Sequence, residues 1–387
     1  MSVPGALTVL DISEYYGETS GGVRTYLSEK SRYVAARPPL GQVLVVPGAD
    51  DSVRKAGSVR HYTVRGPVIP GQAPYRVMYG ARRVAHIVAE ERPDLIELGS
   101  AYLVPWIARP AARRSGIPLV WFYHGNLPRI IAPALGAAPA PGRWLAAAAA
   151  RYVAAIGRRV ERTLVATDFV RADLERFGVE RVTRVPLGVD ADTFHPTRRE
   201  RGAATRRHFG LDDGPLALYT GRFTTEKQLD VAIAGWRRLR HRDATLLLLG
   251  TGPLEGRLGR LADGSRVRLL PFQHDRERLA DLYAAADLYL APGPAETFGL
   301  SAHEAMASGT PVLSVDSGGV AEQVHRSGAG AVYPLGDAAA LAEAADALLD
   351  ADLAALGARA RAFIEAHHRW DTAFDRIFAI YREVAAR

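Results

Sequence analysis

Short apolar runs rich in β-branched residues alternate with helical segments along the chain, and the series starts a second time near the middle. Such alternation is typical of parallel sheets built from βαβ units. The predicted strands of the first series are residues 7–12, 42–46, 95–98, 119–123, 164–167 and 182–186. Those of the second series are residues 216–220, 245–249, 267–272, 288–290, 312–315 and 331–333. Between the two series, residues 188–210 are polar and Arg-rich, and we interpret them as a linker.

The length of the chain also argues for two domains. A chain of 387 residues exceeds what one hydrophobic core usually supports, and its 48% of hydrophobic residues can supply two. The sequence therefore predicts an α/β protein of two Rossmann-like, doubly wound domains that meet near residue 188. Because open α/β sheets bind ligands beyond the carboxyl ends of their strands, two such domains facing a central cleft would hold a ligand there.

Composition narrows the class of protein. No apolar stretch is long enough to cross a bilayer and the N-terminus lacks the pattern of a signal peptide, so we expect a soluble, cytoplasmic protein. The absence of cysteine excludes disulfides and thiolate metal sites. The net charge of +7 is carried almost entirely by Arg, without an Arg/aromatic stripe or zinc-finger spacing, so we expect no nucleic acid as a partner.

Two glutamates with seven residues between them, Glu296 and Glu304, stand where a predicted strand gives way to a helix. A carboxylate before the helix can accept hydrogen bonds from sugar hydroxyls, and one inside its first turns can reach a ribose. The backbone amides between them are suited to an anionic phosphate. The alternative is structural: Ser301 and Glu304 would form a capping pair on a solvated helix.

A glycine loop follows the first predicted strand of each domain. Gly21 and Gly22 open a helix, where their backbone can approach a phosphate closely, although a simple tight turn fits the same residues. In the second domain, Gly221 is followed by Arg222 and Lys227, two cations that can stabilise a departing diphosphate.

The alternative for Lys227 is a surface ion pair with Glu226 or Asp230. Lysine is scarce in this chain, which favours the functional interpretation.

A strongly apolar predicted strand ends in His124, followed by Gly125. A histidine at this place can hydrogen-bond a substrate hydroxyl or shuttle a proton, whereas a buried structural histidine is the alternative. The other histidines, His274 and His303 among them, show no metal-ligand spacing, and we predict no metal site.

Together these residues resemble the group-1 family of retaining glycosyltransferases with the GT-B fold, which includes mannosyl-, glucosyl- and N-acetylglucosaminyltransferases. The resemblance runs from Leu7 to about Tyr381. It also includes Val185-Pro186-Leu187-Gly188-Val189-Asp190, Gly250-Thr251-Gly252-Pro253, the Ala-Met-Ala-Ser-Gly-Thr-Pro run after Glu304, and Trp370-Asp371. The resemblance implies that a last helix at 368–387 returns to the first domain. Residues 1–188 with this helix would then bind the acceptor, and residues 189–367 the nucleotide sugar.

The resemblance implies a role for each candidate residue. Glu296 would contact hydroxyls of the donor sugar and Glu304 those of the ribose. His124 would hydrogen-bond the transferred sugar. The remaining candidates would hold the diphosphate or the base: Gly21, Gly22, Gly221, Arg222, Lys227, Phe272, and the amides around Phe298, Gly299 and Leu300.

The implied reaction moves a hexosyl group from a UDP or GDP sugar to an acceptor hydroxyl of a lipid, a glycan or a secondary metabolite. It retains the anomeric configuration, with the leaving phosphate helping to deprotonate the acceptor, and requires no cofactor. Leu187, Thr251 and Pro271 depart from the usual motifs and leave the base open. The alternatives are a nucleotide-sugar 2-epimerase on the same architecture and a non-catalytic homologue that binds nucleotide sugar.

Three further segments carry weaker signals. Arg151, Arg158 and Arg162 share one face of a predicted helix, which either rests on the anionic inner face of a membrane or is an ordinary surface helix. Residues 130–143 are predicted as a loop that shapes the acceptor site. The acidic pair Asp190 and Asp192 matches a metal-binding pattern but is interpreted as structural.

Overall fold

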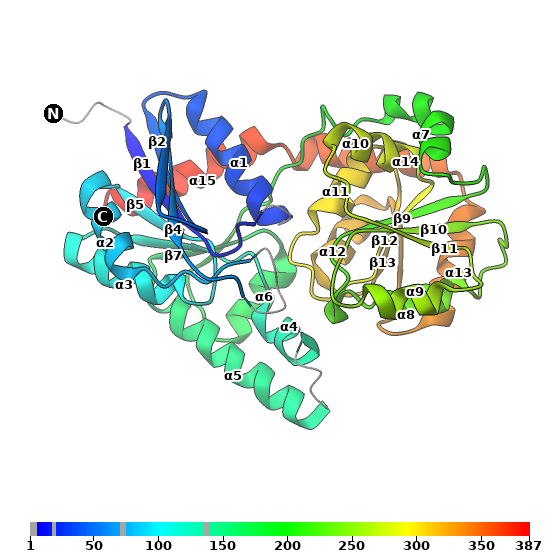
Figure 1. The fold of residues 1–387 in the computed structure, drawn as a ribbon, viewed down its shortest axis with the longest axis horizontal. Coiled ribbons are helices and arrows are strands. Elements are labelled where there is room, and N and C mark those ends of the chain that lie inside the picture. Colours follow the sequence, from blue (N-terminus) through cyan, green and yellow to red (C-terminus); the bar gives the residue numbers. More distant parts are fainter. Residues whose placement is uncertain (1–5, 18–20, 70–74, 135–138) are drawn as a thin grey trace. The chain divides into compact units, whose positions relative to one another are not determined.

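A computed structural model describes residues 6–17, 21–69, 75–134 and 139–387, and the chain divides into two compact units (Figure 1). The first unit comprises Met1–Pro128, Arg143–Leu187 and Trp370–Arg387. The second comprises Arg129–Gly142 and Gly188–Arg369. Each unit is built around its own largely parallel sheet, as the alternation of apolar runs predicts.

The first unit contains an eight-stranded sheet in the order β3-β4-β2-β1-β5-β6-β7-β8. Every pair is parallel except β3 with β4, and the central strand β1 places Val9 opposite both Gln42 and Leu95. The strands are β1 (Leu7–Ile12), β2 (Leu40–Gly48), β3 (Ser52–Ala56), β4 (Val59–Arg65), β5 (Leu95–Leu98), β6 (Leu119–Phe122), β7 (Arg162–Val165) and β8 (Val182–Arg184). The sequence did not predict β3 and β4, because β3 is wholly exposed and β4 alternates polar with apolar residues.

Helices lie between these strands in chain order (Figure 1). They are α1 (Gly22–Ala35), α2 (Ala81–Glu91), α3 (Val104–Ser115), α4 (Leu127–Ala134), α5 (Pro139–Gly157) and α6 (Asp168–Arg176). Most of α4 and the start of α5 belong to the second unit, and the last helix α15 (Trp370–Ala385) follows the second unit in the chain. The expected loop at 130–143 is wrong where it is described, since these residues belong to α4 and α5; residues 135–138 lie outside the described part. The expected helical face through Arg162 is also wrong, because α5 ends at Gly157 and Arg162 begins β7.

The last helix α15 belongs to the first unit, which confirms the expectation from the resemblance. It is held there by Lys30, whose Nζ lies 2.5 Å from Asp11 Oδ1 and 2.7 Å from the hydroxyl of Tyr381 on α15. Tyr381 in turn donates to Glu97, and all four side chains are buried. Strands β1 and β5 and helices α1 and α15 are thus joined by one polar cluster inside the core.

The second unit contains a six-stranded, all-parallel sheet in the order β11-β10-β9-β12-β13-β14. This is the strand order of a doubly wound nucleotide-binding sheet, and its direction of winding reverses between β9 and β12. The strands are β9 (Leu216–Thr220), β10 (Thr245–Leu249), β11 (Val267–Leu270), β12 (Leu288–Ala291), β13 (Val312–Val315) and β14 (Gly330–Tyr333). Buried aliphatic side chains on both faces of the sheet explain why these runs read as nearly continuous apolar stretches.

The helices of this unit are η1 (Pro196–Arg201), α7 (Gly202–His208), η2 (Thr225–Lys227), α8 (Leu229–Trp236), α9 (Glu255–Ala262), α10 (Arg276–Ala285), α11 (Leu300–Ala307), α12 (Gly318–Ser327), α13 (Ala338–Leu349) and α14 (Leu353–His367). The interpretation of 188–210 as a linker is wrong for most of its length. Residues 196–208 form η1 and α7, and Arg198 binds Glu277 and Asp281 on or beside α10. Arginines that suggested a solvated linker are in fact fixed by carboxylates of the unit.

In the described part of the chain, no helix combines the length and apolar character needed to span a bilayer.

Candidate active site

The candidate site of the second unit lies at the carboxyl ends of β9 and β12, where the winding of the sheet reverses. The loop after β9 carries Gly221, Arg222 and Lys227, and the loop after β12 carries Glu296. The two loops touch: a Cβ at Gly293 would lie 3.3 Å from Cδ of Lys227 and 3.7 Å from Cγ of Glu296. The fold therefore brings together residues that are about seventy positions apart in the sequence.

Lys227 and Glu296 form an ion pair across these loops. Their side chains are 22% and 29% exposed, so both remain accessible from solvent. The predicted structural alternative for Lys227 is wrong, because Glu226 instead accepts from Thr224 and Asp230 binds Arg257. A cation and a carboxylate that are accessible and adjacent can bind an anion and hydroxyl groups side by side.

The backbone that follows Glu296 leads directly into the N-terminus of α11. Gly299 precedes the helix with φ 81°, a left-handed conformation that favours glycine, and no side chain caps the helix start. The amide of Ala302 donates to the carbonyl of Gly299 at 3.0 Å, whereas no described residue is a partner for the amides of Leu300 and Ser301, which lie at the positive end of the helix dipole. This is the arrangement that binds phosphate in many nucleotide-binding folds.

The Glu296 loop is also held from behind by α12. The amide of Gly319 donates to the carbonyl of Glu296 at 2.7 Å, and Ser317 Oγ donates to the carbonyl of Pro294 at 3.0 Å. A Cβ at Gly318 would press on the same carbonyls at 3.1–3.2 Å. The loop is consequently fixed through its backbone, which leaves the Glu296 side chain for other contacts.

Glu304 lies one turn into α11 and is buried. It accepts a hydrogen bond from the Tyr283 hydroxyl at 3.1 Å, and Tyr283 also bonds Thr220 at 2.6 Å. Burial raises the pKa of Glu304 to about 7, against the opposing effects of Arg276 and Tyr283. The protonated and ionised forms of the Glu304 carboxyl are therefore both populated near pH 7.

The predicted capping pair of Ser301 and Glu304 is wrong. Ser301 accepts from the hydroxyl of Tyr289 at 2.8 Å, and Glu304 is bound by Tyr283. Tyr283 and Tyr289 thus support the floor of the site through hydroxyl groups. Sequence reasoning missed both residues, because in the sequence they look like ordinary apolar members of a helix and a strand.

Phe298 supports the loop without facing solvent. Its ring is buried and stacks on the imidazole of His303 with centroids 3.9 Å apart, and His303 Nδ1 lies 3.0 Å from the carbonyl oxygen of Gly299. Because a carbonyl only accepts, Nδ1 carries the proton in this contact. Burial lowers the pKa of His303 to about 4, so the ring is neutral at physiological pH. After Tyr283 and Tyr289, His303 is a third residue that the sequence did not assign to the site.

Other candidates of the second unit differ in their surroundings. Arg222 is exposed, and its carbonyl accepts from the Tyr219 hydroxyl at 2.9 Å. The backbone of Gly250 lies so close to Gly221 that a Cβ at Gly250 would collide with the carbonyl oxygen of Gly221. Phe272, after β11, is 36% exposed and contacts the ring of His274. Leu300, the first residue of α11, is half-buried.

Of the acidic pair Asp190 and Asp192, the first residue is bound by protein partners. Asp190 accepts from the amide of Thr193 and from Arg276, each at 3.0 Å. Although burial works against it, these bonds lower the pKa of Asp190. Within the described residues, no three His, Cys, Asp or Glu side chains are arranged to hold a metal ion.

In the first unit, His124 follows β6 and packs between aromatic rings. Its imidazole stacks on Phe122 with centroids 4.4 Å apart and lies 4.9 Å from the ring of Tyr26. Burial, together with the nearby charge of Lys30, lowers the pKa of His124 to about 3. The ring is therefore neutral across the physiological range, which argues against a role as proton shuttle and for one in hydrogen bonding.

The glycines of the first unit begin α1. Gly21 precedes the helix, no side chain caps it, and a Cβ at this position would meet nothing within 4 Å. The fold therefore leaves open space beside Gly21, and Gly22 is the exposed first residue of the helix. The neighbouring Thr19 and Ser20 of the predicted loop lie outside the described residues.

Comparisons with known proteins place this architecture in a family. Residues 20–193 match the model of Glycosyltransferase Family 4, and residues 214–351 match that of Glycosyl transferases group 1. The chain is 34% identical to the GDP-mannose-dependent alpha-(1-6)-phosphatidylinositol dimannoside mannosyltransferase of Mycobacterium tuberculosis, over 82% of this chain and 84% of that protein. It is 36% identical to the D-inositol 3-phosphate glycosyltransferase of Xylanimonas cellulosilytica, over 72% and 69% of the two chains. The chain belongs to the group 1 glycosyltransferases.

Solved structures agree on the fold. Sucrose-phosphate synthase from Thermosynechococcus elongatus superposes with a TM-score of 0.81 at 23% identity, covering 98% of this chain and 99% of that chain. Anabaena Alr3699/HepE in complex with UDP and glucose gives a TM-score of 0.75 at 17% identity, over 97% and 100% of the chains. The fold is the GT-B fold of glycosyltransferases, as the sequence predicted, and the chain is a transferase.

Proposed function

We propose that this protein transfers a hexosyl group from a UDP or GDP sugar to a hydroxyl of an acceptor, with retention of the anomeric configuration and without a bound metal. The observation that carries the proposal is the Lys227–Glu296 pair beside the uncapped start of α11. A cation, a carboxylate and free helix amides together suit one ligand in particular, a sugar joined to a diphosphate.

In this proposal the charges of the second unit act on the leaving group. Negative charge develops on the nucleoside diphosphate as its bond to the sugar breaks, and Lys227, Arg222 and the first amides of α11 stabilise it. Glu296 holds hydroxyls of the transferred sugar, since a carboxylate accepts two or more hydrogen bonds. The leaving phosphate takes the proton of the acceptor hydroxyl on the same face of the sugar.

Glu304 and Phe272 complete the donor contacts. Glu304 accepts hydrogen bonds from the ribose hydroxyls, and its ionised form is the better acceptor for two donors. Phe272 offers an exposed ring to the base. From the first unit, His124 hydrogen-bonds the transferred sugar as a neutral imidazole, and Gly21 and Gly22 offer backbone contacts to the diphosphate.

The relatives bear on donor and acceptor. Two of them are described as dependent on GDP-mannose and others as acting on D-inositol 3-phosphate, and HepE was solved with UDP-glucose. The acceptor that we propose is accordingly a polyol or glycolipid hydroxyl. Both bases remain within the proposal, because Leu187, Thr251 and Pro271 depart from the family motifs.

A thermal-shift panel of UDP, GDP, ADP and TDP tests the donor assignment, because a ligand that binds only the folded state raises its melting temperature. We expect UDP or GDP to give the largest shift and Glu304→Gln to reduce it. The cognate sugar nucleotide should then release its nucleoside diphosphate only when a hydroxyl acceptor is added. Conversion of the donor without acceptor would instead indicate the epimerase, and binding without turnover the non-catalytic homologue.

A further inference from the structure

Residues 98–160 contain eight arginines and no aspartate, glutamate or lysine, so this segment alone exceeds the +7 charge of the whole chain. The arginines are Arg109, Arg113, Arg114, Arg129, Arg143, Arg151, Arg158 and Arg159. The rest of the chain is therefore close to electrically neutral. Such local concentration of one sign of charge attracts an anionic partner.

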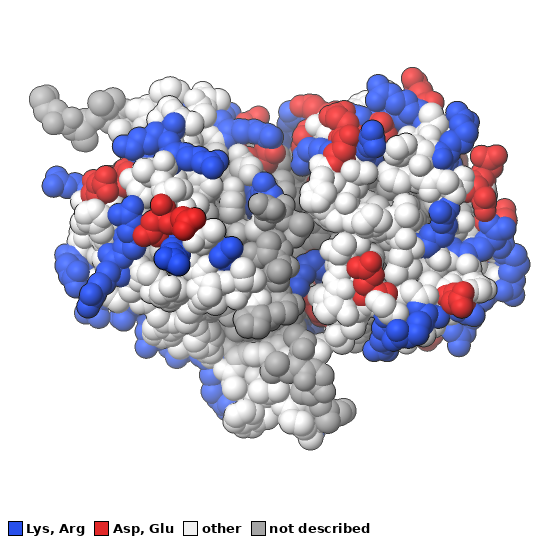
Figure 2. All heavy atoms as spheres, viewed as in Figure 1, with Lys and Arg blue, Asp and Glu red and all other residues white. Residues whose placement is uncertain are grey.

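Helices α3 and α5 of the first unit display most of this charge. Arg113, Arg114, Arg151 and Arg158 are exposed, and none of the four makes an ion pair with a described residue. The margin of the first unit formed by α3 and α5 in Figure 1 shows Lys/Arg and no Asp/Glu in Figure 2. Elsewhere in the chain arginines are commonly paired, as Arg198 and Arg206 are. The α3–α5 face thus has a surplus of positive charge.

Large apolar side chains stand among these arginines. Trp144 on α5 is 69% exposed, and Trp106 on α3 is 40% exposed, with Leu103 beside it at 42%. Trp144 and Arg151 are seven residues apart and share one face of α5, and Trp106 and Arg113 do so on α3. No Arg/aromatic stripe was evident in the sequence, because each helix contributes one tryptophan with an arginine seven residues further on.

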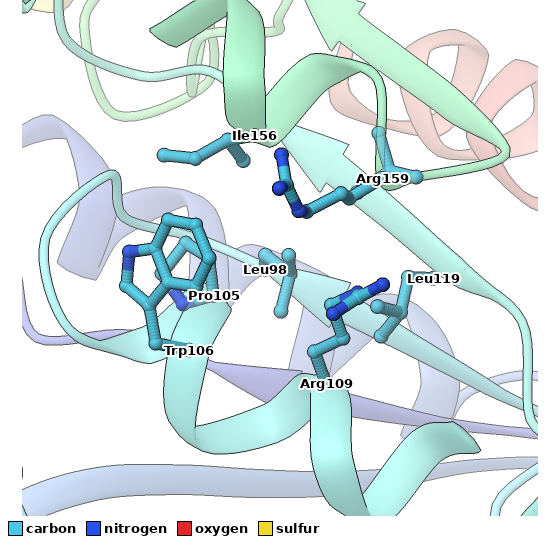
Figure 3. Close-up of a pocket in the computed structure, with 8 residues that line it drawn as sticks. Leu98, Pro105, Trp106, Arg109, Leu119, Ile156 and Arg159 are labelled. Atoms are coloured by element: carbon cyan, nitrogen blue, oxygen red, sulfur yellow. The ribbon is translucent and has the colours of Figure 1, made fainter. Parts of the chain in front are cut away.

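The two helices meet around a shallow apolar crevice, shown in Figure 3. Its walls are Leu98, Pro105, Leu119, Ile156 and Val160, and Trp106, Arg109 and Arg159 flank it. Trp106 Nε1 donates to Tyr152 at 2.8 Å, and the guanidinium of Arg159 lies 5.4 Å from the Trp106 ring. The aliphatic side chains of the crevice are themselves buried, so the exposed apolar surface beside it is that of Trp106 and Leu103.

We propose that the α3–α5 face, defined by Trp106, Arg113, Trp144, Arg151 and Arg158, docks on the surface of an anionic lipid bilayer. Arginine guanidinium groups would bind lipid phosphates, while the indoles sit at the level of the headgroups. This inference concerns where the enzyme works and stands independently of the proposed donor.

An anionic bilayer fits this face better than nucleic acid does. Residues 104–114 and 143–160 contain no Ser, Thr, Asn or Gln, so the face lacks the side chains that usually accompany arginine in base and sugar contacts. It presents instead the exposed side chains of Leu103, Trp106 and Trp144, and such apolar surface gains free energy at a lipid interface.

Vesicle flotation with the full chain tests the proposal. Wild-type protein should float with vesicles of equimolar phosphatidylcholine and phosphatidylglycerol and not with phosphatidylcholine alone. Arg151→Glu/Arg158→Glu should reduce the partition coefficient by about tenfold or more, since each cation near an anionic surface contributes several-fold. Trp144→Ser should lower binding about severalfold while leaving its dependence on salt unchanged.

The matched control is Arg207→Glu/Arg359→Glu, which reverses two exposed arginines of the second unit. It should bind anionic vesicles as wild type does, and near-UV circular dichroism should show all variants folded. Equal loss in the control and in Arg151→Glu/Arg158→Glu would reduce the effect to net charge and overturn the proposal. The proposal would also be overturned if the wild-type protein did not bind anionic vesicles, whether or not it bound RNA through the same arginines.

Discussion

Lys30 of the first unit and Lys227 of the second are two of only three lysines in the chain, and they serve opposite purposes. Lys30 is fully buried, with Asp11 at 2.5 Å and Glu97 at 3.4 Å from its Nζ. Lys227 is 22% exposed and faces the single carboxylate of Glu296. The scarcity of lysine favoured a functional role for Lys227, and the same argument would apply equally to Lys30.

The difference lies in how completely each ammonium is satisfied. Lys30 has three donors and three close oxygen partners, two carboxylates and the Tyr381 hydroxyl, and these come from β1, β5 and α15. The described partners of Lys227 leave it capacity for a ligand. A charged group saturated by its own protein holds the fold, whereas one that is accessible and incompletely bonded is available for chemistry.

Replacing Lys30 should cause the largest loss of stability among the substitutions considered. Lys30→Met leaves Asp11 and Glu97 buried without their cation, and we expect a loss of about 3–5 kcal/mol in the free energy of unfolding. Urea denaturation followed by circular dichroism measures it. Lys55→Met, on the wholly exposed strand β3, is the control and should unfold as wild type does. A Lys30 variant of unchanged stability would mean that the cluster does not hold α15.

Replacing Lys227 should have the converse result. Lys227→Met removes an accessible ion pair, so the free energy of unfolding should change by no more than about 1 kcal/mol. Loss of a cation from the leaving diphosphate should lower the rate of transfer by about 10²–10³-fold. Steady-state kinetics with a saturating acceptor measures this rate, and Lys227→Arg should recover part of it. A variant as unstable as Lys30→Met but still active would reverse the roles assigned here.

How far the fold could be predicted depends on where its strands are buried. Strands β9, β10 and β13 coincide with the predicted runs, since leucine- and valine-rich strands covered on both faces stand out in any sequence. Edge strand β3 is exposed throughout and left no apolar signal. The arginines of η1 and α7 resembled a linker because their carboxylate partners are about eighty residues away.

The candidate site was predictable where it depends on backbone and charge. Lys227 and Glu296 were chosen for their charge and for their places after predicted strands, and the fold does bring the two side chains together. The supporting side chains were not predictable. Tyr283 and His303 act through contacts with residues on other turns or other elements, and nothing in their sequence neighbourhood distinguishes them from core residues.

Tyr381→Phe sharpens the account of the buried cluster. It removes only the hydroxyl that accepts from Lys30 and donates to Glu97, so the cost should be about 1–3 kcal/mol, below that of Lys30→Met. Urea denaturation again measures the difference. Tyr33→Phe is the matched control on the same helix pair, because its hydroxyl bonds Asp375 at 2.6 Å near the surface. Equal effects of the two substitutions would show that burial adds nothing to the cluster.

The smallest expected effect concerns pH and Glu304 of the second unit. Its pKa is about 7, so roughly a tenth of the molecules carry the carboxylate at pH 6 and roughly nine-tenths at pH 8. If the ionised form accepts the ribose hydroxyls, nucleoside diphosphate affinity should rise about tenfold between these values. Calorimetric titration at each pH measures the change.

Glu304→Gln distinguishes the titration of this carboxyl from that of the ligand, because a phosphate of the nucleotide also titrates near pH 6. The amide keeps the size of the side chain and one acceptor oxygen but cannot ionise, so any dependence on pH that remains in the variant belongs to the nucleotide or to other groups. We expect the variant to bind more weakly than wild type at pH 8 and nearly as well at pH 6. An identical pH profile for both proteins would mean that Glu304 does not bind the nucleotide through its carboxylate. It would then be a structural core carboxyl like Glu97 of the first unit, whose pKa burial also raises.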